Sequence, residues 1–444
     1  MTFKRFAWEP SPPALHRAAI GDYVSPGLER CGKKTTGDMG MKRRSLIAGS
    51  AAALSTIPLA RPHAQRNVTI RWWYHFDDPK ATPDELVGNF ERENPGIKIQ
   101  AENIPWGGGG DYDTRLYTTL IAGNGPDTAM VKFNNLARLM EMEALKPLDS
   151  LIDGWAGKAD ISADLWRLHT APDGKRYYIP LQYVVLYLYV RLDLLAKAGV
   201  KVPTNFDEFL TAAKATTGGE QWGFGMRGGS GGHDSWTSFA FGNGGKATKG
   251  GFISPAALAG NRYFVDLHRV HKVCPPSAPT DSFLQIVNNM RAGRTAMTVH
   301  HISTANDMMA AHGDNITAIP VPQGPNGGWA TFGDGSNAVF AASKNPDAAW
   351  KWISWLAEAK NNLLYNKAAG QMTVTTSGAA NWTLHQKRFV DATVGSLPMA
   401  QILPNVPALA DFSRTVWPQN MQKALLGQIE ADEAMRIYEK LFHG

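Results

Sequence analysis

Two aspartates and an aromatic side chain follow the first strand-like segment of the chain, and together they suit a polyol ligand. The segment at residues 68–74 is rich in β-branched and aromatic residues, and Tyr74, His75, Asp77 and Asp78 stand at its end. Carboxylates accept hydrogen bonds from sugar hydroxyls, and a ring can stack on the apolar face of a sugar. The two aspartates could instead cap a turn, which is a common use of that residue.

Further candidates follow later strand-like segments or stand in glycine-rich loops. Trp106 precedes four glycines, which either let a ligand approach the backbone closely or simply make a flexible connection. Asn134 and Asn135 could bind a ligand or cap the helix that is expected after them. The other candidate ligand contacts are Gln182, Tyr183, His233, Asp234, Trp236, His301, Gly333, Asp334, Asn337 and Gln371.

Two of these candidates have an equally simple structural interpretation. Trp236 is expected to stack on the ligand, so that Trp236→Ala weakens binding by about 1 to 3 kcal/mol, yet tryptophan is often largely buried in a core. His300 and His301 follow a strand-like segment, where alternation points one side chain in and the other out. His301 is expected to reach the ligand, with an ordinary hydrogen-bonded imidazole as the alternative.

A hydrolase pattern also occurs. Gly228-x-Ser230-x-Gly232 follows a strand-like segment at residues 221–227 and matches the nucleophile elbow of α/β hydrolases. A secreted serine hydrolase would use Ser230, a later aspartate, and His301 or another histidine. Because the match lies within a run of Gly and Ser, chance agreement is easy, and this function is a remote alternative.

The residues that could hold a metal are poorly spaced. His268 and His271 share a helical face but lack a spaced acidic partner. Tyr177 and Tyr178 lack a clear set of companions for iron. The sequence therefore predicts neither a metal site nor a cofactor.

Strand-like and helix-like segments alternate along the chain, which implies a parallel α/β sheet. Ligands bind at the carboxyl ends of the strands in such sheets, so the residues just after the strands are the site candidates. Thr204 is the expected N-cap of the helix at residues 206–215. The expected strands are residues 68–74, 97–101, 128–133 and 184–190, and the expected helices are residues 84–93, 112–122, 136–142, 193–198 and 206–215.

The basic residues at 42–44 and the small, apolar run at residues 46–60 indicate an export signal. The run is too short for a membrane span, which needs about 20 apolar residues. Arg43-Arg44-x-Leu46-Ile47 resembles the twin-arginine signal, with an ordinary Sec signal as the alternative. We expect cleavage after Ala64 and release into the periplasm.

Residues 1–40 would bury this signal, which is normally N-terminal, so we expect that they are a mis-called extension and that Met41 is the start. The signal peptide is then residues 41–64. Residues 1–65 hold ten of the 45 Lys and Arg and four of the 39 Asp and Glu, so 35 basic and 35 acidic residues remain. A formally neutral mature chain gives no sign of a nucleic-acid partner. After the signal Cys274 stands alone, so it has no partner for an intramolecular disulfide.

An ordered set of short motifs spans almost all of residues 68–444 and resembles the extracellular solute-binding proteins of sugar ABC importers, the maltose-binding-protein-like group. The chain departs from the pattern at Val131, where the family usually places an aromatic ligand contact. The motifs are Phe90-Glu-x-Glu-Asn-Pro95-Gly-Ile, Gly125-Pro126-Asp127, Leu145-Lys-Pro-Leu-Asp149, Asp173-Gly174 with Ile179-Pro180, Asp193-Leu-Leu-x-Lys-Ala-Gly199, Pro203-Thr-Asn-Phe-Asp-Glu-Phe209, Met290-x-x-Gly293-Arg-Thr-Ala-Met297, Ile319-Pro-Val-Pro322, Lys344-Asn-Pro-Asp-Ala-Ala349-Trp and Leu403-Pro-Asn-Val-Pro407.

The resemblance implies a type II periplasmic-binding-protein fold, in which two discontinuous α/β lobes are joined by a hinge and the ligand cleft lies between them. The N-terminal lobe would comprise residues 66–184 plus 334–398. The C-terminal lobe would comprise residues 185–333 plus 399–444. A chain of this length normally divides into two domains, which agrees with that division.

The implied function is capture of a mono- or oligosaccharide or a polyol in the periplasm and its delivery to an inner-membrane ABC permease. No covalent chemistry is implied, and we expect a monomer. The alternative ligand is glycerol 3-phosphate or a glycerophosphodiester, for which Lys132 and Arg227 could balance the phosphate. Asp77 and Asp78 weigh against it, because they would repel a phosphate beside them.

Overall fold

The computed structural model describes residues 67–76, 81–104 and 110–444. These residues belong to one compact unit, residues 63–444. The predicted export signal and the candidate contacts Asp77, Asp78 and Trp106 lie outside the described residues. Within the described part of the chain, no helix has the length and the apolar character needed to cross a membrane.

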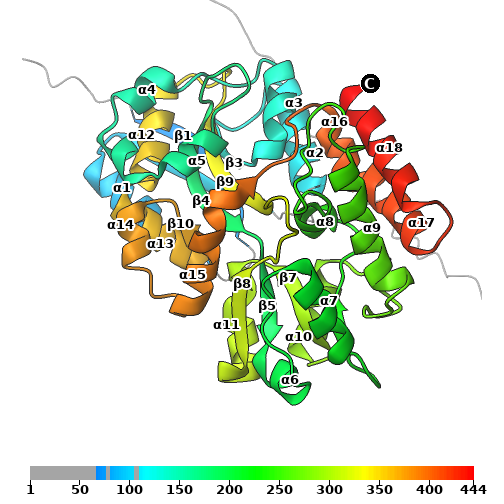
Figure 1. The fold of residues 1–444 in the computed structure, drawn as a ribbon. Coiled ribbons are helices and arrows are strands. Elements are labelled where there is room, and N and C mark those ends of the chain that lie inside the picture. Colours follow the sequence, from blue (N-terminus) through cyan, green and yellow to red (C-terminus); the bar gives the residue numbers. More distant parts are fainter. Residues whose placement is uncertain (1–66, 77–80, 105–109) are drawn as a thin grey trace, which may run out of the picture. The chain divides into compact units, whose positions relative to one another are not determined.

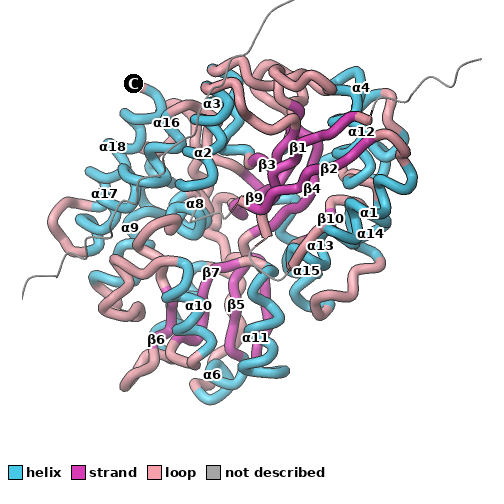
Figure 2. Tube along the Cα trace, turned by 180° about the vertical axis from the view of Figure 1, so that it is seen from behind, coloured by secondary structure: helices cyan, strands magenta, loops and turns pink. Residues whose placement is uncertain are grey.

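The strands form two sheets (Figures 1 and 2). The first has the order β10-β4-β9-β3-β1-β2, with β11 paired to β9, and the second has the order β6-β7-β5-β8. The strands are β1 (Val68–Tyr74), β2 (Ile97–Asn103), β3 (Thr128–Val131), β4 (Tyr178–Val185), β5 (Tyr187–Arg191), β6 (Trp222–Gly225), β7 (Thr295–His300), β8 (Ile316–Pro320), β9 (Ala330–Val339), β10 (Met372–Thr373) and β11 (Ala400–Gln401).

Helices connect the strands and pack against both sheets (Figure 1). They are α1 (Asp84–Glu93), α2 (Gly110–Ile121), α3 (Leu136–Glu141), α4 (Asp149–Asp153), α5 (Ala163–Leu168), α6 (Leu192–Lys197), α7 (Phe206–Ala215), α8 (His233–Ala240), α9 (Pro255–Arg269), α10 (Phe283–Arg291), α11 (Ala305–His312), α12 (Pro346–Leu356), α13 (Ala359–Ala369), α14 (Thr376–Ala380), α15 (Lys387–Ser396), α16 (Ala408–Asp411), α17 (Trp417–Leu425) and α18 (Ala431–His443). Two short turns also matter below, the 3-10 turn η2 (Phe133–Asn135) and the π-helical turn η7 (Phe412–Val416).

The alternation of strand and helix is confirmed, but the first sheet is mixed rather than parallel. Strand β1 runs parallel to β2 and to β3, as expected, whereas β9 runs antiparallel to β3 and to β4. The direction of β9 follows from the chain path. Strand β4 leaves the first sheet at its carboxyl end, and β9 returns from the second sheet at that same edge, so the two must run in opposite directions.

The prediction of a single strand at residues 184–190 is wrong, because the chain passes from the first sheet to the second within that segment. Strand β4 ends at Val185 and β5 begins at Tyr187, with only Leu186 between them. The N–H of Leu186 donates to the carbonyl oxygen of Thr331 at 3.0 Å, so the crossing is fastened to β9. The lobe boundaries at residues 184/185, 333/334 and 398/399 stay a prediction.

Alternation along β1 buries both faces of the first sheet. Trp72 and Tyr74 lie in one apolar cluster with Trp352, and Trp73 lies in another with Tyr112. Each of these side chains is at most 6% exposed. A sheet covered by helices on both faces buries most strand residues, so the residues beyond its strand ends are the first candidates to face a ligand.

Helix α7 shows how local sequence sets an element's start. The helix occupies the predicted residues 206–215, but its N-cap is Asn205 rather than Thr204. The Asn205 side chain accepts a hydrogen bond from the N–H of Glu208 at 2.9 Å. Thr204 donates instead to the Glu208 carboxylate at 2.7 Å, so the two residues share the capping of this helix.

Candidate functional site

A cleft of about 1430 Å³ is lined by residues from both sheets, and many of them stand just beyond the carboxyl end of a strand. His75 and Phe76 follow β1, Asn134 follows β3, Arg227 follows β6 and His301 follows β7. This placement agrees with the rule that α/β sheets bind ligands at their carboxyl edges. The volume exceeds the roughly 300 to 1,000 Å³ of common small-molecule pockets, so it can hold a ligand of more than one sugar ring.

The strands that carry the chain between the sheets also line the cleft. Gln182 and Tyr183 of β4 and Gly333 and Asp334 of β9 contribute to it. Thr331, at the start of β9, donates its hydroxyl to the backbone oxygen of Asp234 at 2.6 Å. The first turn of α8 is therefore tied to the crossing strand, which places Asp234 at the same cleft.

Asp334 is held by its own network below the cleft surface. Its Oδ1 accepts from the backbone N–H of Phe133 at 2.8 Å, and its Oδ2 accepts from the hydroxyl of Ser336 at 2.8 Å. His169 lies 2.8 Å from the same hydroxyl, and its Nε2 is 3.6 Å from Oδ2 of Asp334. With one hydrogen bond accepted by each oxygen and the residue 7% exposed, Asp334 fixes the η2 turn against β9.

Two stacked imidazoles stand at the end of β7. The rings of His300 and His301 are 4.3 Å apart, and Phe283 packs on His300 at 4.7 Å. Burial lowers the pKa of His300 to about 4 and lowers the pKa of His301 well below its ordinary value, and the positive charge of Arg227 adds to both effects. His301 is therefore neutral at physiological pH. Its Nδ1 lies 2.9 Å from the hydroxyl of Ser303, which leaves Nε2 for the cleft.

Several side chains of the cleft carry a buried polar atom that has no hydrogen-bond partner among the described residues. Three are amide oxygens, on Asn134, Gln182 and Gln371, one is the carboxylate oxygen Oδ1 of Asp113, and two are ring nitrogens, Nδ1 of His233 and Nε1 of Trp329. A buried polar atom without a partner costs about 1 to 3 kcal/mol. Ligand hydroxyls, which both donate and accept, would satisfy such a mixed set.

The structure brings ten of the predicted contacts to this cleft. Whether each of them touches a ligand stays a prediction. The ten are His75, Asn134, Gln182, Tyr183, His233, Asp234, His301, Gly333, Asp334 and Gln371.

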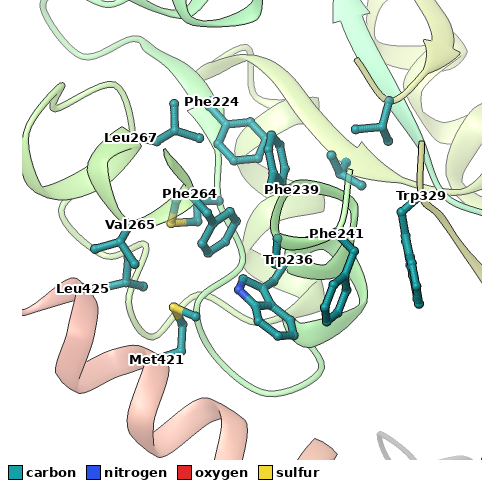
Figure 3. Packing of buried hydrophobic residues seen from close by; sticks show 14 of the residues in the cluster. Phe224, Trp236, Phe239, Phe241, Phe264, Val265, Leu267, Trp329, Met421 and Leu425 are labelled. Carbon is teal, nitrogen blue, oxygen red and sulfur yellow. The ribbon is translucent and has the colours of Figure 1, made fainter. Parts of the chain in front are cut away.

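Trp236 is a correction, because the structure buries it completely. Its side chain is 0% exposed, and its indole N–H donates to the side-chain oxygen of Asn261 at 2.7 Å. Its ring packs against Phe241, Trp417 and Tyr438. Figure 3 shows Trp236 beside Phe241 in the core that covers the second sheet. The alternative interpretation, that Trp236 packs in a core, is therefore confirmed, and Trp236 cannot stack on a ligand.

Three more predicted contacts do not line the cleft. Tyr74 points into the core of the first sheet, stacked on Trp72 at 4.9 Å, because its place in β1 gives it that face. Asn135 is 1% exposed, and its side chain accepts from the N–H of Lys132, so it caps the η2 turn. It also stands at the N-cap of α3, but its side chain makes no capping hydrogen bond to that helix, contrary to the alternative. Asn337 is 0% exposed and accepts from the indole of Trp72 at 3.1 Å.

The sequence patterns did not indicate several residues that line the cleft. Phe283 and Trp329 are aromatic side chains at the cleft, and they stand where no strand end was expected. Asp113 and Arg414 form an ion pair of 2.7 Å there, with Asp113 4% exposed. Burial raises the pKa of Asp113, and the charge of Arg414 opposes that rise. Residues three hundred positions apart leave no local signal in one sequence.

We expect the Asp113–Arg414 pair to show a coupling of about 1 to 3 kcal/mol in a double-mutant cycle of Asp113→Ala and Arg414→Ala, because Asp113 is buried. Urea unfolding of the four proteins measures it. The control cycle uses Arg138 and Glu141, a surface pair of 2.7 Å for which about 0.3 to 0.5 kcal/mol is expected. Equal coupling in the two cycles would show that burial adds nothing to the Asp113 pair.

The hydrolase pattern does not assemble a triad in the described residues. Ser230 stands in the turn between β6 and α8, and its backbone oxygen accepts from Nε of Arg227 at 2.8 Å. Within the part of the chain that the structure describes, no hydrogen bond joins the Ser230 hydroxyl to an imidazole. No group of three or more His, Cys, Asp or Glu side chains placed to hold a metal ion occurs there either.

Known proteins resemble this chain over most of its length or over a smaller part of it. A binding protein of Brucella abortus (strain 2308) is 25% identical over 404 residues, which are 88% of this chain and 96% of the relative. A multiple sugar-binding protein of Streptococcus mutans is 24% identical over 178 residues, 38% of each chain.

Solved structures share the fold. An ABC transporter solute-binding protein of Thermotoga lettingae, bound with α-D-tagatose, has a TM-score of 0.71 at 23% identity and covers 84% of this chain and 98% of its own. The GacH receptor of Streptomyces glaucescens, solved with acarbose, has a TM-score of 0.73 at 23% identity, with 85% and 97% covered. A solute-binding protein of Agrobacterium vitis, with D-mannitol, has a TM-score of 0.66 at 22% identity, with 84% and 97% covered.

The two sheets, the crossing strands and the cleft at the strand ends agree with these likenesses. The family model for bacterial extracellular solute-binding proteins matches residues 76–363, which include the crossings at Leu186 and β9. The chain belongs to the bacterial extracellular solute-binding protein family.

Proposed function

We propose that this protein captures a carbohydrate or a polyol in the cleft and delivers it to an ABC permease of the inner membrane. The observation that carries the proposal is the set of buried polar atoms without partners on Asn134, Gln182 and Gln371, together with the ring nitrogens of His233 and Trp329. Such a set suits a ligand with many hydroxyls. The sugars and sugar alcohols held by proteins of the same fold give independent support.

Capture would work through differential affinity. Gln182 lies in β4 and Gln371 directly precedes β10, both strands of the first sheet, whereas His233 begins α8 and His301 directly follows β7 of the second sheet. A ligand that touches both groups stabilises the closed arrangement over the open one, and only this difference shifts the equilibrium. The site would then bind without covalent chemistry, and the protein would be a receptor rather than an enzyme.

The place of action follows from the family, whose members work outside the cytoplasm. The finer location is part of the proposal. Export would use the twin-arginine-like signal at residues 41–64, with cleavage after Ala64, and the product would act as a monomer in the periplasm.

Thermal unfolding of the purified chain against monosaccharides, oligosaccharides and sugar alcohols tests the proposal. A ligand at 100 times its dissociation constant is expected to add about 2.7 kcal/mol of stability, which appears as a higher Tm. Peptides and free metal ions serve as the comparison set. A rise in Tm with these and with no carbohydrate would refute the proposal.

A further inference from the structure

Arg227 brings a positive charge to the cleft. It follows β6, lines the cleft and is partly buried, and burial lowers the pKa of its guanidinium without removing the charge. Within the described residues no carboxylate lies within 4.0 Å of it, in contrast to Arg414, which is paired with Asp113. Burying a charge without a partner is costly, so a folded protein keeps one mainly where a ligand completes it.

The chain holds this guanidinium in one position. Its Nε donates to the backbone oxygen of Ser230 at 2.8 Å, and its carbon lies 6.0 Å from the ring centre of Phe283. Gly231 has a φ of +73°, and a Cβ at that position would overlap the guanidinium. The glycine-rich run that resembles a nucleophile elbow thus has another use, because it makes room for the arginine head.

The hydrogen bond to Ser230 uses one of the guanidinium nitrogens. The two terminal amino groups have no hydrogen-bond partner among the described residues, and they are not closed off from the cleft. Two parallel N–H groups of an arginine match the two oxygens of a carboxylate or a phosphate. A neutral hydroxyl would use only part of this fork.

The neighbouring charges leave the positive sign dominant at this point. Asp234 is the acid that acts on Arg227, and its carboxylate lies 3.2 Å from Nε2 of His233, whose pKa is lowered by burial. Lys132, which stands at the end of β3 on the first sheet, lines the same cleft. Both Lys132 and Arg227 lower the pKa of His301, so cations from the two sheets act on one place in the cleft. An anionic group between them would favour closure.

We propose that Arg227 anchors an anion subsite, and that the natural ligand is a carbohydrate or polyol carrying a carboxylate or a phosphate group. The inference rests on the proposed function, because it names the ligand class of the same cleft. A carboxylate and a phosphate both present paired oxygens to the two terminal amino groups of Arg227. Ligands that differ only in carrying one group or the other distinguish the two possibilities. Lys132 would meet the same group from the first sheet.

Isothermal titration with matched ligands tests the subsite. The panel pairs glucose with glucuronate and glucose 6-phosphate, and glycerol with glycerate and glycerol 3-phosphate, against the wild type, Arg227→Gln and Arg227→Lys. We expect an acid to bind the wild type more tightly than its neutral partner. Arg227→Gln should weaken the acid about 10- to 100-fold, the worth of charge-assisted hydrogen bonds, and the neutral partner by less than about threefold. Arg227→Lys, which keeps the charge but loses the fork, should fall between them.

The control variant is Arg436→Gln, which removes an exposed cation on α18, away from the cleft lining, and should leave every dissociation constant unchanged. Melting of each unliganded variant checks that it folds. Neutral sugars that bind as tightly as the acids, or an equal loss for both in Arg227→Gln, would overturn the subsite and leave carbohydrate capture standing. Binding of none of the panel, together with failure of the wider sugar screen, would reject both proposals.

Discussion

Trp236→Ala is expected to lower the free energy of unfolding by about 3 to 5 kcal/mol, the scale of a large aromatic side chain removed from a core. The side chain is 0% exposed, and its loss would also leave the oxygen of Asn261 without its indole donor. The expected effect is on stability, and the dissociation constant of the folded protein for its ligand should stay near that of the wild type. Urea unfolding and titration of the same sample measure the two quantities.

Two further variants make this prediction specific. Trp236→Phe keeps an aromatic ring but loses the N–H, so it should cost less than the alanine variant. Leu426→Ala removes a side chain that is 58% exposed and should change the stability by less than about 0.5 kcal/mol. A Trp236→Ala protein with wild-type stability and weakened ligand binding would return this residue to the cleft and contradict its buried position.

The protein is expected to lose stability as the pH falls from about 6.5 towards 4, because its buried histidines are neutral. Burial lowers the pKa of His300 and of His385 to about 4 in the folded protein, whereas unfolded histidine has a pKa near 6.5. The unfolded chain therefore binds protons first, and the stability present above about pH 6.5 is lost on acidification. Between pH 7 and pH 5 each histidine would cost about 2 kcal/mol.

Urea unfolding at several pH values checks the size and the origin of this loss. The double variant His300→Gln, His385→Gln should lose about 4 kcal/mol less than the wild type between pH 7 and pH 5, if the two contributions add. Each single variant should lie midway. A wild type whose stability is flat over this range, or a double variant with an unchanged slope, would show that these two imidazoles do not control it.

Local sequence patterns predicted an element well where its secondary structure depends on its own residues rather than on its neighbours in the fold. Helix α1 occupies the predicted residues 84–93, because its apolar side chains recur at helical spacing and Gly96 follows its end. Strand β1 likewise has the predicted bounds. The run at residues 184–190 was different, because its apolar residues are equally buried in both sheets, and the break at Leu186 depends on which strand lies beside each half.

The site was predictable only in part for the same reason. Asn134 and His301 stand beyond strand ends and line the cleft. They could be predicted because α/β sheets bind ligands at the carboxyl ends of their strands, and the order of the elements along the chain is enough to identify those ends. The prediction for Trp236 was wrong because the residues around it belong to helices that are remote in sequence, such as Asn261 on α9 and Tyr438 on α18. Asp113 and Arg414 form an ion pair although most of the chain separates them in sequence. The spacing of residues in a single sequence does not predict such a pair.

The paired strands β4 and β9 limit how the cleft can open. Their ladder runs from Tyr178 to Val185 up to the point where the chain changes sheets, and β11 adds a third strand at Ala330 and Thr331. A hydrogen-bonded ribbon can bend and twist with little loss of pairing, but sliding one strand along the other breaks every bond in the ladder. Relative movement of the two sheets is thus reduced to something close to one rotation. A single pair of spectroscopic labels, one on each side of the cleft, is enough to follow the whole transition.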